Sequence, residues 1–356
     1  MHQTHVDLGG RMVPFGGWDM PVQYESIIQE TKAVRNSSGI FDVSHMGRVE
    51  ISGPAAAAFL NRVLSFAPPG LRLGRARYGV ICAVDGGIID DCITYRRSED
   101  RYLLIPNAGN TPAVLEWLDR WARPGDAVTI DDVTSRTAMI AHQGPEAAGV
   151  LGRLTELDLA SVKSFRAIDA QVAGGEAFLA RTGYTGEDGF EVIVPADRAV
   201  ELWTLLRDGG ATPCGLGARD VLRLEAGMLL HGNDMDTSVN PAEAGLGRFV
   251  DPDRDGYMAG EALRRIRDDG VGRTLVGFNV IGRGIARHGY PIMHGAERIG
   301  TVTSGSYSPT LDRSIGMGYV PTGHSAVGSR LHVDVRGRQI EVEVASLPFY
   351  SRRRAS

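Results

Sequence analysis

The sequence predicts an α+β fold that ends in a small antiparallel barrel, and two patterns carry this prediction. Between about Gly47 and Arg123 the expected elements follow the order strand, helix, two strands and helix, and residues 127–130 add a further strand. This order suggests a ferredoxin-like α+β unit rather than a doubly wound sheet. Past about residue 272 only short β-rich runs separated by glycines and turn residues follow, as in an antiparallel barrel or jelly roll.

Local patterns justify each element in turn. Apolar residues at helical spacing predict an amphipathic helix at 23–36, and Pro54 begins another helix, where its missing N–H costs nothing. Asp85-Gly86 joins two predicted strands as a hairpin. The predicted strands before the barrel are 41–53, 78–84, 87–95, 102–105, 127–130 and 137–142, with more through residue 194, and the other helices are 111–121, 145–154, 199–208 and 218–226. The predicted barrel strands are 274–280, 298–304, 314–320, 330–335 and 339–344.

Composition excludes several classes of protein. The 356 residues are 43% hydrophobic and 23% charged, which is typical of two or three globular domains. A net charge of −5 argues against a nucleic-acid partner. The three cysteines form no CxxC pair, so neither a zinc site nor a disulfide framework is expected. No apolar run is long enough to span a membrane and the N-terminus has no apolar signal core, so we expect a cytoplasmic protein.

The common cofactor motifs are missing from the sequence. It contains no GxxxxGK[ST], HExxH or GxSxG motif, and Gly215-Leu-Gly217 does not continue as GxGxxG. Lys32 and Lys163 are the only lysines, which rules out a Schiff-base or phosphate-loop lysine almost everywhere else. NAD, ATP and metal chemistry therefore have little support.

The segment from Arg181 to Glu191 is rich in glycine and polar side chains. Its glycines allow tight turns or the close approach of a ligand. Tyr184 offers an aromatic face, and the Glu191 carboxylate can accept two hydrogen bonds from the donor edge of a flat heterocycle. The alternative is a hairpin whose turn is merely acidic, and this segment alone leaves both interpretations open.

Asp90 and Asp91 are adjacent within a predicted strand, where carboxylates are unfavourable. Successive strand residues point to opposite faces, so one carboxylate should face solvent and the other inward. An inward carboxylate needs a partner or a role. The structural alternative is that it caps a helix or pairs with Arg75 or Arg77.

Three further polar clusters stand out. His45 could be a base, but a histidine at a strand end is more often a hydrogen-bonded structural residue. Arg219 begins a helix after a glycine turn and could contact an anionic or carbonyl group, whereas structural ion pairs of Arg219 and Arg223 with Asp220 or other neighbours are the alternative. The segment from His231 to Asp236 does not fit an EF-hand and is interpreted as loop structure.

Taken in order, these clusters resemble the aminomethyltransferase family of the glycine cleavage system, the T-proteins, within the folate-binding aminomethyltransferase superfamily. The resemblance covers about His5 to Tyr350. Its motifs are Phe15-Gly-Gly-Trp18-Asp-Met-Pro21, Phe41-Asp-Val-Ser-His-Met-Gly47, Gly86-Gly-Ile-Ile-Asp-Asp91, Gln143-Gly-Pro145, Arg181-Thr-Gly-Tyr-Thr-Gly-Glu-Asp-Gly-Phe-Glu191, Gly215-Leu-Gly-Ala-Arg-Asp220, Arg223-Leu-Glu-Ala-Gly227, Gly232-Asn-Asp-Met-Asp236, Thr303-Ser-Gly-Ser-Tyr-Ser-Pro-Thr-Leu311 and Leu347-Pro-Phe-Tyr350.

The resemblance implies a three-domain cloverleaf around a central channel that binds tetrahydrofolate. It also implies the substrate, an aminomethyl group on the lipoyl arm of the H-protein, and the products methylenetetrahydrofolate, ammonia and dihydrolipoyl H-protein. The domains we expect are 1–46 with 135–250, which bind folate, a ferredoxin-like unit at 47–134, a connector at 251–271 and a barrel at 272–356. We expect a monomer, because the partner surface must stay free.

The resemblance also implies roles for single residues. Asp91 would be the catalytic carboxylate, which orients the reactive ring nitrogen of the folate, stabilises a cationic intermediate and shuttles a proton. Glu191 would bind the amino and ring N–H donors of the pterin. Tyr184 and Arg219 would line the pterin site, and Met46 and Asn107 the folate channel. The arginines at 352–354 would meet the folate tail or the partner protein.

The sequence departs from the family pattern in places. An aromatic residue and a lysine commonly follow Gly245-Leu-Gly, whereas this chain continues from Arg248. His231 stands where tyrosine is common, and Pro106 precedes Asn107. These departures concern the one-carbon donor, so a demethylase or a specialised one-carbon transferase on the same fold is the alternative. A folate-binding module for iron–sulfur maintenance is disfavoured, because its lysine-glycine-cysteine-tyrosine segment is missing.

Overall fold

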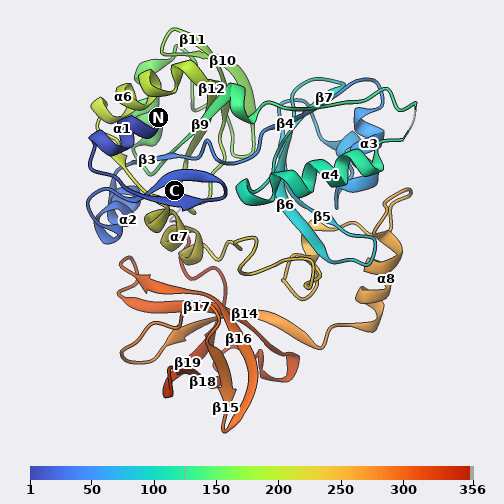
Figure 1. The fold of residues 1–356 in the computed structure, drawn as a ribbon, viewed down its shortest axis with the longest axis vertical. Helices are drawn as coiled ribbons and strands as arrows, with labels where there is room; N and C mark the ends of the chain where they lie inside the picture. Colours follow the sequence, from blue (N-terminus) through green and yellow to red (C-terminus); the bar gives the residue numbers. More distant parts are fainter. Residues whose placement is uncertain (124, 353–356) are drawn as a thin grey trace.

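The protein folds into three lobes around a common centre (Figure 1). The computed structural model describes residues 1–123 and 125–352. One lobe contains a six-stranded sheet, a second contains a five-stranded sheet and the third is a closed barrel. The predicted α+β class and the C-terminal antiparallel barrel are confirmed. No helix in the described ranges has the length and apolar character needed to cross a membrane.

The first lobe is built on a sheet with strand order β10-β11-β12-β9-β3-β13. All neighbours are antiparallel except β3 and β13. Its strands are β3 (Gly39–Asp42), β9 (Thr137–Gln143), β10 (Ala167–Val172), β11 (Gly175–Ala180), β12 (Gly189–Pro195) and β13 (Thr212–Pro213). Its helices are α1 (His2–Asp7), α2 (Ile27–Asn36), α5 (Ala147–Leu151), α6 (Ala199–Asp208) and α7 (Leu216–Glu225), and a hairpin of β1 (Arg11–Phe15) and β2 (Trp18–Gln23) precedes α2.

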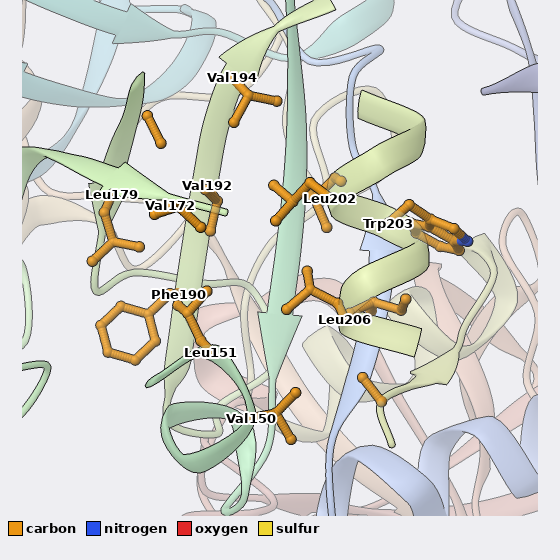
Figure 2. Close-up of a cluster of buried hydrophobic side chains, with 14 of the residues drawn as sticks. Val150, Leu151, Val172, Leu179, Phe190, Val192, Val194, Leu202, Trp203 and Leu206 are labelled. Carbon is orange, nitrogen blue, oxygen red and sulfur yellow. The ribbon is translucent and has the colours of Figure 1, made fainter. Parts of the chain in front are cut away.

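Helix α6 covers one face of this sheet because its apolar side chains recur at helical spacing. Leu202, Trp203 and Leu206 are almost completely buried. Figure 2 shows Leu202 and Leu206 on the side of the helix toward the strand residues Val192 and Val194 and Trp203 on its opposite side, and all five belong to one apolar cluster. Burying a side chain of this size stabilises the fold by about 1.5–3 kcal/mol, so this cluster holds the helix on the sheet.

The second lobe contains a sheet with strand order β5-β6-β7-β4-β8, in which every neighbouring pair is antiparallel. Its elements are β4 (Val49–Ser52), α3 (Ala56–Val63), β5 (Ala76–Cys82), β6 (Ile88–Arg96), β7 (Arg101–Ile105), α4 (Thr111–Trp121) and β8 (Thr129–Asp132). The predicted hairpin at Asp85-Gly86 joins β5 to β6. Because β7 extends this hairpin into a three-strand meander, the sheet has one strand more than the four-stranded βαββαβ arrangement.

The single strand predicted at 41–53 is wrong, because the chain turns between two sheets there. Strand β3 ends at Asp42, and its carboxylate Oδ1 accepts a hydrogen bond of 2.9 Å from the Ser44 backbone N–H. The Met46 N–H then donates to the Val43 carbonyl at 3.0 Å. This side-chain-to-backbone turn ends the strand and carries the chain from the first lobe into the second.

The third lobe is a barrel that closes in the order β14-β17-β16-β15-β18-β19. Its strands are β14 (Arg273–Val280), β15 (Pro291–His294), β16 (Glu297–Ser308), β17 (Arg313–Pro321), β18 (Arg330–Val335) and β19 (Arg338–Ala345), and α8 (Gly260–Asp269) lies in the connector before them. Strand β15 was not predicted. It is short, and its register with β16 shifts between Ile292 and Met293. A shifted register breaks the alternation by which strands are recognised.

The first two lobes share buried side chains. Phe41 and Val43 from the first lobe pack in one cluster with Tyr95, Leu103 and Ile105 from the second. The domain boundaries expected from the sequence stay a proposal: residues 1–46 with 135–250, 47–134, the connector 251–271 and 272–356. The shared cluster means that the first two units are joined by apolar packing as well as by the chain.

His142 in β9 makes the fold sensitive to acid. Its side chain is fully buried, and neither ring nitrogen has a hydrogen-bond partner within the described ranges. Burial lowers the pKa of His142 to about 4, from a usual value near 6.5. Below about pH 6.5 the unfolded chain binds a proton that the folded chain does not, so stability falls as the pH falls from about 6.5 to about 4.

We therefore expect His142→Leu to reduce the loss of stability in acid. Between pH 7.5 and pH 5 the variant should lose about 1–2 kcal/mol less of its free energy of unfolding than the wild type. Urea titrations at the two pH values measure this difference. The exposed His294→Leu serves as a matched control, and an equal loss in wild type and His142→Leu would contradict the explanation.

Candidate active site

The acid pair of β6 is held by a single asparagine. The Nδ2 atom of Asn107 lies 2.7 Å from Oδ1 of Asp90 and 2.7 Å from Oδ1 of Asp91. The backbone N–H of Asn107 donates to Oδ2 of Asp90 at 3.0 Å, and the Tyr78 hydroxyl donates to Oδ2 of Asp91 at 2.9 Å. Asp90 is fully buried and Asp91 is partly buried. The pair is thus fixed in place by β5 and by the turn after β7.

One expectation for this pair is corrected. Neither carboxylate caps a helix or pairs with the suggested arginines; both bind Asn107 instead. The two carboxylates occupy successive positions in regular register with β5, and Asp90 is buried while Asp91 is partly exposed. The Asn107 amide, in the turn after β7, reaches both of them.

The electrostatics of the pair suit proton transfer near neutral pH. Burial raises the pKa of both carboxyls, and the neighbouring charge of Asp90 raises that of Asp91 further. The hydrogen bonds from Tyr78 and Asn107 oppose this shift. The pair therefore keeps a proton under conditions in which an exposed aspartate is fully ionised, so it can accept or return one during a reaction.

A second group of predicted residues forms an aromatic and charged wall. The guanidinium carbon of Arg219, on α7, lies 4.9 Å from the centre of the Tyr184 ring. The Tyr184 hydroxyl donates to the Leu229 carbonyl, which fixes the ring. Nη1 of Arg219 is buried and has no hydrogen-bond partner in the part of the chain that the structure describes. A buried guanidinium with an unused donor is suited to a polar ligand.

Glu191 completes this wall from β12. Its Oε2 atom accepts hydrogen bonds from the Thr182 hydroxyl at 2.6 Å and from the Tyr95 hydroxyl at 3.5 Å. Burial raises its pKa, while the Thr182 hydroxyl and the charge of Arg219 act in the opposite direction. The carboxylate is thus buried with one oxygen occupied, near a positive charge that favours its ionised form.

The glycines between Arg181 and Glu191 are required by close packing. A Cβ at Gly183 would lie 1.9 Å from Oε1 of Gln143, and Gly186 has a φ of +77°. The Gln143 side chain binds both ends of the segment and its middle: its Nε2 donates to the carbonyls of Thr182 at 3.1 Å and Phe190 at 3.4 Å, and its Oε1 accepts from the Thr185 hydroxyl at 2.9 Å. The loop is therefore rigid.

The acidic residues of this loop separate into two kinds. Glu187 pairs with Arg35 at 2.8 Å and Asp188 pairs with Arg181 at 2.5 Å, so both act in the structure of the loop. Tyr184 and Glu191 instead interact with Arg219: its guanidinium carbon lies 4.9 Å from the Tyr184 ring centre, and its charge acts on the Glu191 carboxylate. The structure therefore favours the ligand-binding interpretation of the segment over a merely acidic turn.

His45, for which the sequence favours a structural role, lies close enough to Arg219 to be affected by its charge. It is 3% exposed, and its Nδ1 atom has no hydrogen-bond partner among the described residues. Burial, followed by the charge of Arg219, lowers the pKa of His45 to about 4, so its ring is neutral at pH 7. The expectation of a hydrogen-bonded structural histidine does not hold for Nδ1. The sequence around His45 allowed a base at this position, but nothing in it indicated that the ring lies near Arg219.

The remaining predicted residues have different surroundings. Met46 follows His45 and packs against the apolar cluster shared by the first two lobes. Asn107, predicted to line a channel, donates its amide N–H groups to the acid pair. Arg352 pairs with Asp188 at 3.1 Å. Arg353 and Arg354, for which a contact was also considered, lie outside the described residues.

An ion pair that the sequence did not reveal joins α7 to the turn at Asp234 and, through Ser304, to the barrel. Arg223 is 1% exposed, and its Nη1 lies 2.6 Å from Oδ2 of Asp234. Ser304 of β16 binds both partners, at 2.7 Å to Arg223 and 2.8 Å to Asp234. Asp220 also pairs with Arg223, at 2.7 Å, whereas Arg219 lies over Tyr184. The network fixes α7, and with it Arg219, against the barrel.

Surface hollows do not identify the site. Two hollows of about 330 and 730 Å³ lie against α2 and against β10 to β12, and neither is lined by the acid pair or by Tyr184, Glu191 or Arg219. Within the described ranges no group of three histidine, cysteine or acidic side chains is placed to hold a metal ion. The chemistry of the clustered side chains, rather than the size of a hollow, marks the site.

The fold and the site together define a three-lobed α+β protein that ends in an antiparallel barrel and carries a buried acid pair near a cationic aromatic wall. Residues 1–254 match the GCVT N-terminal domain, and residues 273–351 match the glycine cleavage T-protein C-terminal barrel domain. The chain therefore belongs to the glycine cleavage T-protein family.

Individual proteins agree with this assignment. The chain is 47% identical to an aminomethyltransferase of Streptomyces avermitilis, over 98% of this chain and 96% of that protein. It is 44% identical to an aminomethyltransferase of Geobacillus kaustophilus, over 99% of this chain and 98% of that protein. The crystal structure of the glycine cleavage system aminomethyltransferase T of Bartonella henselae superposes with a TM-score of 0.94 at 34% identity, covering 99% of this chain and 97% of that one.

Proposed function

We propose that this enzyme transfers the aminomethyl carbon from the lipoyl arm of the H-protein to tetrahydrofolate. The products are methylenetetrahydrofolate, ammonia and dihydrolipoyl H-protein. Membership of the T-protein family makes it an aminomethyltransferase. The observation that carries the residue assignment is the acid pair held by Asn107, with Tyr184 in electrostatic range of Asp91 and Arg219 in electrostatic range of both Tyr184 and Glu191.

The wall residues fit a reduced pterin. A pterin is flat, has amino and ring N–H donors along one edge and has a carbonyl oxygen. Both hydrogen bonds that Glu191 accepts end on Oε2, which leaves Oε1 for those donors. Arg219 has a buried donor for an acceptor atom, and the Tyr184 ring supplies an aromatic surface. Met46, on the apolar side, and Asn107 would line the rest of the channel.

The transfer requires two protons to move. Two nitrogen–carbon bonds form on the folate and release two N–H protons, while the carbon's bonds to ammonia nitrogen and to sulfur break. One proton completes ammonia and the other completes the thiol. Asp91 is suited to carry them, because burial and Asp90 raise its pKa toward neutrality. Its ionised form also stabilises a cationic intermediate, and Tyr78 and Asn107 hold it in place.

We also propose that the enzyme acts as a monomer in the cytoplasm. A monomer leaves its surface free for the lipoylated H-protein. Neither nucleic acid nor a membrane is required for the reaction. Arg352 is already paired with Asp188, so any contact it makes with the folate tail or the H-protein has to compete with that ion pair.

Glu191→Gln should weaken tetrahydrofolate binding by about 10- to 100-fold, because it replaces charge-assisted hydrogen bonds with neutral ones. Its hydroxyl partners Thr182 and Tyr95 remain, so folding should be preserved. Isothermal titration measures the dissociation constant. Glu176→Gln is the matched control, because Glu176 is an exposed residue of β11. Unchanged binding in Glu191→Gln would remove this residue from the pterin site.

The identity of the donor is tested with a carbon label. The enzyme is mixed with tetrahydrofolate and either H-protein carrying a ¹³C-labelled aminomethyl-lipoyl arm or labelled N-methyl and S-methyl compounds. We expect label in methylenetetrahydrofolate only from the H-protein. Label in methyltetrahydrofolate from a free methyl compound, with none from the H-protein, would instead establish a demethylase.

A further inference from the structure

We propose that Arg35 is a positioning residue for the pterin site, because it fixes the distance between the two elements from which that site is built. Tyr184 and Glu191 come from the glycine-rich loop at 181–191, whereas Arg219 lies on α7. These elements are separate in the sequence, so the site forms only where another part of the fold holds them together. The inference rests on the role proposed above for these three residues.

The Arg35 guanidinium binds the glycine-rich loop directly. Its Nη1 donates to the Thr185 carbonyl at 2.7 Å and to Oε1 of Glu187 at 2.8 Å. Between these two residues the loop packs closely on the end of α7: a Cβ at Gly186 would lie 2.9 Å from the Cβ of Ala226. Arg35 therefore binds the loop on both sides of its close approach to α7.

The same guanidinium also binds α7. Its Nε and Nη2 donate to Oε2 of Glu225 at 3.0 and 2.7 Å, and Nη2 donates to the Leu222 carbonyl at 3.4 Å. Glu225 is fully buried, and its carboxylate accepts further hydrogen bonds from the hydroxyls of Ser308 and Thr310, at 2.6 and 2.9 Å. The planar fork of the arginine thus binds the loop and α7 at the same time, which a compact ammonium group is not shaped to do.

The segment that follows the barrel encloses Arg35 from a third direction. The Arg35 guanidinium carbon lies 3.9 Å from the centre of the Tyr350 ring. The Tyr350 hydroxyl donates to Oε1 of Glu187 at 2.7 Å, and the Tyr350 backbone N–H donates to the Glu225 carbonyl at 2.7 Å. The Arg35 side chain is only 5% exposed. Because packing and hydrogen bonds fix this side chain, a shift of the loop relative to α7 would break its contacts.

The charges around Arg35 determine which substitutions test this role. Two carboxylates, Glu187 and Glu225, share the one guanidinium. Glu187→Ala leaves the pair of Arg35 with buried Glu225 in place, whereas loss of the guanidinium would leave Glu225 without a cation. Arg35→Lys keeps a cation beside Glu225 but removes the planar fork. These two variants therefore loosen the loop without removing the positive charge beside the buried carboxylate.

The test compares tetrahydrofolate affinity with turnover at saturation. In both variants the dissociation constant of tetrahydrofolate should rise by about 3- to 30-fold, while turnover with saturating tetrahydrofolate and loaded H-protein stays within about threefold of the wild type, because the acid pair lies on another lobe. Hydrogen exchange at the amides of 182–188 should become faster, with no change in α4. Glu201→Gln, in a surface ion pair with Arg198, is the matched control. Loss of the Glu187 charge alone would favour an anionic folate, so weaker binding in Glu187→Ala indicates a displaced loop.

An unchanged dissociation constant in both variants would overturn this inference. A fall in saturated turnover as large as the loss of affinity would do so too, because it would mean a general loss of structure rather than a displaced loop. The failure of the proposed pterin site has another signature: Glu191→Gln would bind tetrahydrofolate as the wild type does. If Glu191→Gln binds weakly while Arg35→Lys and Glu187→Ala bind normally, the pterin site stands and the role of Arg35 does not.

Discussion

Asp91→Asn should lower turnover by about 100-fold or more, while the dissociation constant of tetrahydrofolate changes by less than about threefold. Asparagine has the same shape as aspartate, but it can neither accept a proton nor stabilise a cation by its charge. The pterin contacts proposed for Glu191, Tyr184 and Arg219 do not involve Asp91. Binding and chemistry should therefore separate in this variant.

The experiment uses single-turnover kinetics with loaded H-protein and a parallel folate titration. Asp85→Asn is the matched control, because Asp85 lies in the exposed turn between the same two strands. The control should behave as the wild type does. Near-normal turnover in Asp91→Asn would remove Asp91 from the chemistry, and loss of folate binding together with turnover would show that its main role is in binding.

Arg223→Met should destabilise the protein by about 3–5 kcal/mol, because it leaves the buried Asp234 carboxylate without its cationic partner. Asp234 is fully buried, and the Nη1–Oδ2 distance in the pair is 2.6 Å. Ser304 and the Leu230 N–H would remain as its hydrogen-bond donors, but neither carries a charge. Since α7 also carries Arg219, folate binding should weaken as well.

Urea unfolding measures the change in stability. The double variant Arg223→Met with Asp234→Leu should recover most of the loss, since replacing both charges by apolar side chains removes the uncompensated carboxylate. Arg120→Met is the surface control: its ion pair with Glu116 is exposed and should be worth less than about 1 kcal/mol. A small effect of Arg223→Met, comparable to that control, would mean that water or another group compensates for Asp234.

Much of the fold follows from local patterns in the sequence. The helices at Thr111–Trp121 and Ala199–Asp208 begin and end as predicted, because apolar spacing and Pro112 or the following glycine define them locally. The Asp85-Gly86 hairpin is equally local. The short barrel strands were recognisable by their turns, except for β15, whose shifted register hides its alternation.

The arrangement of the site depends on contacts that are distant in sequence. The amide of Asn107 reaches across 17 positions to Asp90, and no spacing rule indicates that both carboxylates share it. His45 was taken for an ordinary strand-end residue, yet burial beside Arg219 makes it neutral. The loose alternation of residues 41–53 predicted one strand, so the turn at Asp42 that separates the first two lobes was not predicted. Residue types indicate which side chains can bind a ligand or transfer a proton. The packing of the lobes determines which of these side chains meet.

The most direct test of the account is ammonia release by the purified enzyme, given tetrahydrofolate and H-protein that carries the aminomethyl-lipoyl arm. We predict stoichiometric ammonia and methylenetetrahydrofolate that depend on both substrates and that are lost in Asp91→Asn. No ammonia from the wild type, with tetrahydrofolate still bound in a titration, would contradict aminomethyl transfer and show that the one-carbon donor is a different molecule.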